Sequence, residues 1–177
     1  MKYFLVTLFV CCCIGIAHAQ KDTAVSLKTI LLEQLRTTHN VKDWFVPVDS
    51  AIAGLTAAQA MWKDSTENHS IAQLTNHLIF WNEQILAKFK GEKPATFNGD
   101  NKETFSGVDE TTWPLAVQKI DSVLAAIEKE VMAADDNKLK KWYSTLYHVG
   151  THNAYHTGQI LYIRKMKGWW NDERGVK

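Results

Sequence analysis

The spacing of apolar residues constrains the fold of this 177-residue chain more than any other feature. Over long stretches, apolar side chains recur every three or four residues, the period of an α-helix, rather than at every second residue as in a half-buried strand. Only three prolines interrupt the chain, at Pro47, Pro94 and Pro114. The sequence therefore predicts an all-α protein.

The first predicted helix spans residues 27–52 and carries a single apolar stripe. Pro47 interrupts this stripe, so the helix is either kinked at Pro47 or split near Asn40. Trp44 and Phe45, the aromatic pair of this segment, are expected to pack in the core. The stripe consists of Leu27, Leu31, Leu35, Thr38, Val41, Phe45, Val48 and Ile52.

The second predicted helix has signals at both ends. Ser70-Ile-Ala-Gln73 has the Ser-x-x-Gln form of a capping box, which places the N-cap at Ser70. The helix is expected to end near Phe89, because Gly91 suits the left-handed conformation that stops a helix. Its inward stripe consists of Ile71, Leu74, Leu78, Trp81 and Ile85.

A long polar connection, residues 91–112, separates the second helix from the third. The third helix opens at Thr112-Trp-Pro114, with Pro in its first turn, and is broken by residues 135–137. The fourth begins between residues 142 and 145 and runs to about Lys167, with Gly168 as its C-terminal cap. Four helices with one long crossover predict a four-helix bundle in a single domain.

The N-terminal segment has the form of a secretory signal peptide. Lys2 precedes a short apolar run, residues 4–16, and an Ala-x-Ala sequence ends at Ala19, where cleavage is expected. The run is too short for a membrane helix, which needs ~20 residues. We therefore expect a signal peptide at 1–19, one domain at 20–177, and a secreted or periplasmic protein. An acylated lipoprotein is the alternative, which the lack of a small-residue pair before Cys11 disfavours.

All three cysteines, Cys11 to Cys13, lie in the predicted leader and would be removed with it. The remaining chain has no thiol, which excludes disulfides, zinc–thiolate sites and a catalytic cysteine. It carries equal numbers of acidic and basic residues, because Lys2 is the only charged residue of the leader. A neutral chain without a basic stripe argues against nucleic-acid binding. No stable membrane insertion is expected after cleavage.

Three histidines are expected to face the core of the bundle. His77 lies three residues after Leu74 and four before Trp81. His152 and His156 lie one turn apart on the fourth helix and follow its buried stripe. Imidazoles from two facing helices form a candidate site for a divalent metal. Hydrogen-bonded core histidines are the alternative that spacing alone leaves open.

The other histidines receive different predictions. His148, one turn before His152, falls at the edge of the inward face. His39 precedes the possible break in the first helix and is expected to be solvated, with the mouth of the pocket as the alternative position. His69 precedes the Ser70 cap and is expected to be exposed. No carboxylate shares the inward face of the last helix, so the Glu base of an H-E-x-x-H protease is absent.

Two motifs resemble those of the DinB-like (DNA-damage-inducible, YfiT-like) family. They are Leu74-Thr-Asn-His77-Leu-Ile-Phe-Trp-Asn and His148-Val-Gly-Thr-His152-Asn-Ala-Tyr-His156-Thr-Gly-Gln159-Ile. The resemblance covers nearly the whole chain after the leader. It implies a four-helix bundle with up-down-down-up topology, often as a homodimer, and a divalent metal held by His77, His152 and His156.

Three protein ligands would leave open positions for water or substrate, which is the pattern of a catalytic site. The metal would lower the pKa of a bound water or thiol and polarise a substrate oxygen. Zinc or nickel is expected first, and iron or manganese also suits three imidazoles. Gln159 could orient a ligand or water, with a structural role as the alternative. Four further residues could likewise contact the metal ligands from outside, with a structural role as the alternative: Asn76, Asn82, Asn153 and Tyr155.

The resemblance implies an enzyme, although the sequence assigns no catalytic residue. Family members that are understood resemble metal-dependent thiol-S-transferases that use cytosolic low-molecular-weight thiols. Export would separate this protein from those thiols, so we favour a metal-dependent hydrolase of an unidentified small molecule. The alternatives are a non-enzymatic stress-associated protein that binds a metal or ligand, and a thiol-S-transferase-like enzyme.

Overall fold

The computed structural model describes residues 25–176, and the predicted signal peptide at 1–19 lies outside this range. The described chain is all-helical, as predicted. None of the helices in this range is long and apolar enough to cross a membrane. The elements are the α-helices α1 (Leu27–His39), α2 (Val48–Ile52), α3 (Ala57–Met61), α4 (Ile71–Lys90), α5 (Trp113–Ala133) and α6 (Asp136–Met166), and the 3-10 helices η1 (Asn101–Phe105) and η2 (Asp172–Arg174).

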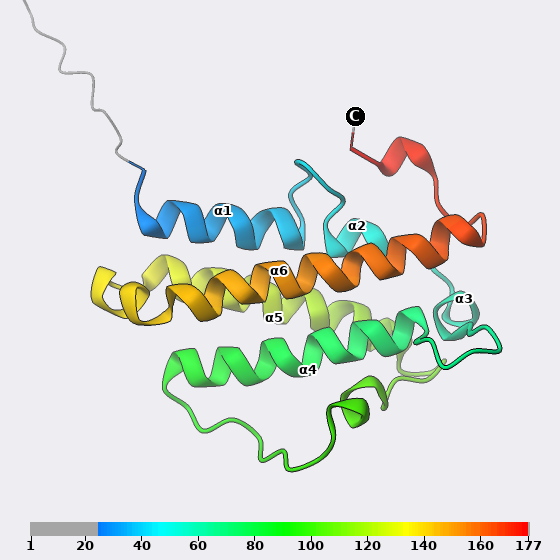
Figure 1. The fold of residues 1–177 in the computed structure, drawn as a ribbon, viewed down its shortest axis with the longest axis horizontal. Helices are drawn as coiled ribbons and strands as arrows, with labels where there is room; N and C mark the ends of the chain where they lie inside the picture. Colours follow the sequence, from blue (N-terminus) through cyan, green and yellow to red (C-terminus); the bar gives the residue numbers. More distant parts are fainter. Residues whose placement is uncertain (1–24, 177) are drawn as a thin grey trace, which may run out of the picture.

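The four long helices α1, α4, α5 and α6 lie side by side along the long axis of the molecule (Figure 1). Helix α4 packs on α5 and α6, and α1 packs on the same two helices. The colour gradient shows that α1 and α6 run in one direction, and α4 and α5 in the other (Figure 1). Two consecutive helices that run the same way need a long connection, which residues 91–112 supply between α4 and α5.

Both predicted ends of α4 are confirmed. Ser70 Oγ accepts a hydrogen bond from the Gln73 backbone N–H, and the Gln73 side chain accepts one from the Ser70 backbone N–H. Gly91 ends the helix with a φ of 81°, in the left-handed region where a Cβ would be strained. These two ends fix the register of α4 and therefore the direction in which His77 points.

The prediction of one long first helix is wrong beyond residue 39. Helix α1 ends at His39, and Pro47 is the N-cap of a separate helix, α2, rather than a kink. Residues 40–47 are not helical, so the helical phase that placed Trp44 and Phe45 inside is lost. Their exposed fractions are 89% and 39%, and the predicted core packing of this pair is therefore wrong.

The last helix is longer than predicted, because it begins at Asp136 rather than at residue 142–145. Asp135 acts as its N-cap, since the carboxylate accepts a hydrogen bond from the Lys138 backbone N–H at 2.8 Å. Only Ala134 and Asp135 separate α5 from α6. Of the residues 135–137 that were expected to break the third helix, Asp135 thus lies in a tight turn between two antiparallel helices, and the other two begin α6.

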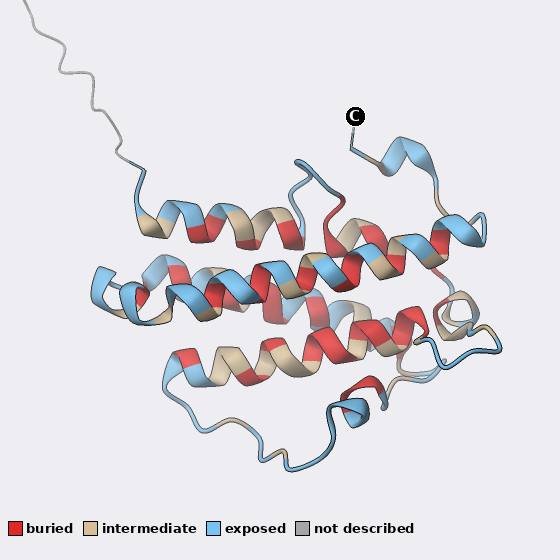
Figure 2. Ribbon diagram, in the orientation of Figure 1, coloured by how far each residue is buried: buried red, intermediate tan, exposed pale blue. Residues whose placement is uncertain are grey.

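Buried residues line the inward faces of the four long helices (Figure 2). One apolar cluster joins α2 and α3 to the start of α4, and the other joins α1 to its far end. Where the clusters meet along α4 and α6, several of the buried side chains are polar. A buried polar group costs free energy unless it is hydrogen-bonded or liganded, so this layer is where a functional site is expected. Its members are His77, Asn82, Asn153 and His156.

Candidate metal centre

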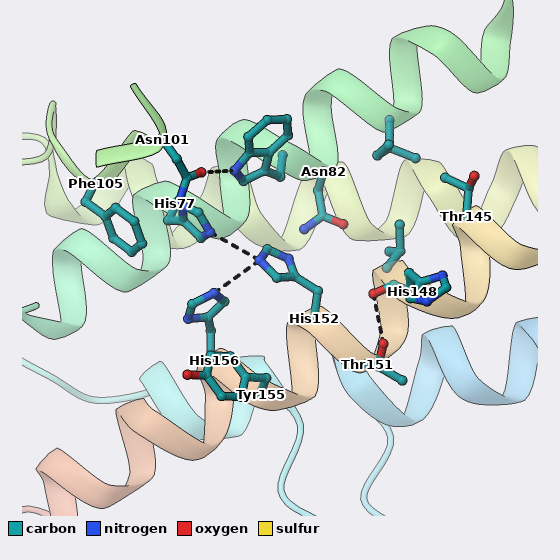
Figure 3. Close-up of a pocket in the computed structure, with 13 residues that line it drawn as sticks. His77, Asn82, Asn101, Phe105, Thr145, His148, Thr151, His152, Tyr155 and His156 are labelled. Atoms are coloured by element: carbon teal, nitrogen blue, oxygen red, sulfur yellow. Dashed lines mark hydrogen bonds between the residues drawn. The ribbon is translucent and has the colours of Figure 1, made fainter. Parts of the chain in front are cut away.

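Three imidazoles from two helices converge on one point. Helix α4 supplies His77, and α6 supplies His152 and His156, one turn apart. The Nε2 atom of His152 lies 3.1 Å from Nε2 of His77 and 3.1 Å from Nε2 of His156. Figure 3 shows the rings pointing toward one another, and one ligand atom from each lies within 4.8 Å of the others. The structure thus brings the three predicted residues together as a group able to hold a metal ion.

The tautomer of His77 is set by the crossover segment. Thr104 Oγ1 donates its hydrogen to the Asn101 carbonyl at 2.6 Å, so it must accept the hydrogen bond from His77 Nδ1, also at 2.6 Å. This Nδ1–H form leaves a lone pair on Nε2, the nitrogen that faces the other histidines. Asn76 holds η1 in place by donating to the Thr104 carbonyl at 2.8 Å.

A second hydrogen bond sets the tautomer of His156 in the same way. Gln159 Oε1 accepts from His156 Nδ1 at 2.6 Å, which leaves a lone pair on His156 Nε2. Gln159 is held in turn by Tyr155, whose hydroxyl accepts from Gln159 Nε2 at 3.4 Å. Gln159 and Tyr155 therefore act on the site through the histidine ring.

This convergence is unfavourable without a cation. Lone pairs on Nε2 of His77 and His156 both face Nε2 of His152, which can donate only one hydrogen. At least one pair of nitrogens would therefore meet lone pair to lone pair, with a hydrogen bond unmade in a largely buried place. A divalent ion that accepts all three lone pairs removes the conflict, and metal-bound histidines commonly donate Nδ1–H to such outer partners. The residues thus fit the metal that the family resemblance implies.

Burial keeps the three imidazoles uncharged. Burial is the main cause that lowers the pKa of His77 to about 3, and the nearby His156 and His152 lower it further. Burial and then His156 lower the pKa of His152 to about 4. Burial also lowers the pKa of His156, although its hydrogen bond to Gln159 opposes the shift. Neutral imidazole is the metal-binding form, so at neutral pH no proton has to leave before an ion binds.

An aromatic stack fixes the plane of His77. Phe105, at the end of η1, lies nearly parallel to the His77 ring with centroids 4.0 Å apart. His69 stacks on Phe105 as well, with centroids 3.7 Å apart. The predicted exposure of His69 is therefore wrong, because the stack leaves this ring half-buried.

The histidines line one side of a pocket of about 690 Å³. Aromatic and aliphatic side chains form most of its wall, with some hydroxyl and amide groups; none of the described lining residues is a carboxylate, a lysine or an arginine. Trp81 is held there because its indole N–H donates to Asn101 at 3.1 Å. Tyr155 lines the pocket with an exposed fraction of 64%. Neither bulky residue closes the site, which is open to a small uncharged molecule.

His148 lines the same pocket but lies outside the three-histidine group. It is exposed, in agreement with its predicted place at the edge of the inward face. Its Nδ1 donates to the Ser144 carbonyl at 2.7 Å, which leaves Nε2 free to accept a hydrogen. Asn82 and Asn153 form no hydrogen bond to a described histidine; Asn82 Nδ2 donates to Asn153 Oδ1 at 2.9 Å and so ties α4 to α6.

The crossover residues that support the site were not predicted. Thr104, Asn101 and Phe105 lie in a segment expected to have no helix. A signal was present, because Asp100-Asn-Lys-Glu103 has the form of a capping box, and both of its hydrogen bonds are formed at the start of η1. That motif predicts a turn of helix, but not that the turn packs on His77.

The fold and site define a helical protein with three histidines that could hold a metal ion beside an open pocket. Comparison of the sequence with protein families identifies the class more narrowly: the DinB superfamily matches residues 48–160. The chain belongs to the DinB superfamily, as the two histidine motifs indicated. No curated protein and no solved structure matches the sequence significantly.

Proposed function

We propose that the protein binds a divalent transition-metal ion through His77, His152 and His156 and hydrolyses an uncharged small molecule in the adjoining pocket. The observation that carries this proposal is the convergence of three Nε2 atoms, two of them in a fixed tautomer, beside a pocket open to solvent. A structural ion is usually enclosed by four protein ligands, whereas three ligands beside an open pocket suit a catalytic ion. Zinc and nickel fit three nitrogen ligands best.

The protein's own residues divide the work at this site. When bound, the ion supplies Lewis acidity, which polarises a carbonyl and lowers the pKa of water. Thr104 and Gln159 keep both Nδ1 hydrogens in place, so the Nε2 lone pairs stay aimed at one point. Trp81 and Phe105 offer apolar surface to the substrate. His148 is the lining residue outside the triad with a free basic nitrogen, and its Nε2 would hold a proton during turnover.

The experiment is turnover of a panel of neutral esters, amides and lactones by the metal-loaded protein. We expect His152→Ala to abolish turnover together with metal binding. His148→Ala should keep the metal and lose about 10²-fold or more in rate, the usual size of a general-base contribution. Equal rates for the wild type and His152→Ala would contradict the proposal.

The absence of a carboxylate among the lining residues favours one other function, a non-enzymatic binding protein. In that case the pocket would bind ligands saturably without turnover. We also propose, from the leader, that the protein is exported, which separates it from cytosolic thiols and disfavours thiol transfer. The run of the four long helices supports the up-down-down-up bundle that the family resemblance implies, and that resemblance also supports a homodimer.

A further inference from the structure

A second group of metal-binding side chains lies where α1, α2 and α5 meet, and none of its members lines the histidine pocket. His39, the last residue of α1, is 1% exposed, so its predicted solvation is wrong. Its Nε2 lies 3.1 Å from Asp121 Oδ1 and 3.6 Å from Asp49 Oδ2. Its Nδ1 lies 2.6 Å from Glu128 Oε1.

The hydrogen bond to Glu128 decides what Nε2 of His39 can do. A carboxylate only accepts, so His39 Nδ1 carries the hydrogen of this bond. In neutral His39, the Nε2 lone pair then points at two carboxylates, Asp121 and Asp49. Such an arrangement needs a positive charge between nitrogen and oxygens. A carboxylate behind a histidine, with ligands in front of it, is the usual support of a metal-bound imidazole.

The charges around His39 distinguish a metal ion from a proton. Three carboxylates surround His39, those of Asp49, Asp121 and Glu128, and among the described residues one guanidinium, that of Arg36, pairs with them, at 3.6 Å from Glu128. These groups carry two excess negative charges when His39 is neutral. A proton on His39 would leave one excess negative charge, whereas a divalent ion balances both charges. The end of α1 adds to the attraction, because carbonyl groups at a helix C-terminus favour cations.

We propose that His39, Asp49 and Asp121 form a second divalent-cation site that joins the end of α1 to α2 and α5, with Glu128 orienting the imidazole. One nitrogen and two carboxylate oxygens suit Mn²⁺ or Zn²⁺ better than they suit softer ions. Asp121 has 57% of its side chain exposed, which gives an ion a way in and leaves room for water ligands. Burial first, and then the neighbouring Asp121 and Glu128, raise the pKa of Asp49, against the attraction of His39.

Counting bound Mn²⁺ tests this site, because the thiolates of the leader bind this hard ion poorly. The full chain is compared with His152→Ala/His156→Ala, which lacks the first centre. We expect this variant to bind one Mn²⁺ per chain, and to lose it when Asp121→Asn is added. Glu130→Gln, which removes an acidic residue elsewhere on α5, is the matched control and should keep the ion. Glu128→Gln should weaken binding ~10- to 100-fold, the range found for outer partners of a metal-bound histidine.

The readouts separate this site from the first one. If Asp121→Asn alone lowers the Mn²⁺ count by one while His152→Ala/His156→Ala leaves it unchanged, the second site stands. The proposed function fails separately, if His152→Ala/His156→Ala also leaves the Zn²⁺ count unchanged. Should the folded His152→Ala/His156→Ala variant bind no Mn²⁺, or Asp121→Asn bind as many ions as its parent, the second site is overturned. His39 would then only hydrogen-bond the carboxylates that surround it.

Discussion

The two histidine groups of this protein differ in what surrounds the imidazole. In the pocket, three rings face one another, and neutral oxygens of Thr104 and Gln159 accept the Nδ1 hydrogens. At the helix junction a single ring, His39, faces three carboxylates. The same side chain therefore meets other imidazoles and neutral acceptors in one place and carboxylates in the other. The residues that surround a histidine, more than the histidine itself, therefore decide which cation binds there.

The largest expected effect separates ligands from bystanders on α6. His156→Ala should remove one Zn²⁺ per chain, because two imidazoles alone hold the ion weakly. His148→Ala, two turns earlier on the same helix, should leave the Zn²⁺ count unchanged, since this residue is outside the group. Metal content after dialysis, measured by mass spectrometry, checks both variants. Loss of the ion in both would mean that the triad is not the binding site.

The next effect concerns Gln159, the neutral side chain that accepts the Nδ1 hydrogen of His156 in the pocket. Gln159→Leu should weaken Zn²⁺ binding ~10- to 100-fold, because His156 would lose the acceptor that fixes its tautomer. Gln159→Glu keeps an acceptor and should restore the affinity. Competition with a chelator of known affinity measures both constants. If Gln159→Leu and the wild type bind alike, Gln159 is only a surface residue.

The pH dependence of stability should show the neutral character of the pocket histidines. In metal-free protein the pKa values of His77 and His152 fall to about 3 and about 4, from 6.5 in the unfolded chain. The unfolded chain therefore binds more protons between pH 6.5 and 4, and the free energy of unfolding should fall as pH is lowered through this range. We expect a loss of about 2 kcal/mol, less than the full shifts would give, because His152 is only half-buried.

Urea unfolding at several pH values measures this dependence. His152→Ala should reduce the slope, because one of the two titrating groups is gone. An equal slope in His152→Ala and the wild type would show that the pocket histidines are not the cause.

The smallest effect concerns the carboxylates around His39. The raised pKa of Asp49 means that its ionised form is disfavoured on folding, mainly by burial. This carboxyl contributes stability below the unfolded pKa of 3.8 and loses it as pH rises through the folded value. In metal-free protein at neutral pH, Asp49→Asn should therefore raise the free energy of unfolding, by about 0.5 kcal/mol for this partly exposed group.

Asp43→Asn, on the exposed loop before α2, is the control for Asp49→Asn and should change nothing. Denaturant melts in the presence of a chelator compare the two variants. A clear destabilisation by Asp49→Asn would show that its carboxylate pairs favourably with His39 even without a metal.

Local rules predicted the three-histidine group, because its members lie on two helices whose phase is set by sequence. The Ser70 capping box fixed the start of α4, and hence the inward direction of His77. One turn of helix separates His152 from His156, which placed both on one face. Their partners could not be predicted equally well. Thr104 reaches His77 only because the crossover folds back on α4, which no local pattern encodes.

The group around His39, where α1, α2 and α5 meet, could not be predicted from local rules. His39 was expected to be solvated because it precedes a helix break, where side chains are usually exposed. Its burial depends on how α1 packs on α5, which periodicity does not fix. Asp121 and Glu128 did carry a signal, because seven residues is about two turns and places both on one face of α5. The prediction that Trp44 packs in the core failed for a related reason, because it assumed a helix that in fact ends five residues before Trp44.

The most direct test of the three-histidine centre is anomalous diffraction at the zinc edge from crystals of the zinc-loaded protein. We predict a peak within bonding distance, ~2.0–2.1 Å, of Nε2 in His77, His152 and His156. The Nδ1 hydrogen bonds to Thr104 and Gln159 should be unchanged. An anomalous map without a peak at this point, with the three rings only hydrogen-bonded to one another, would contradict the metal centre.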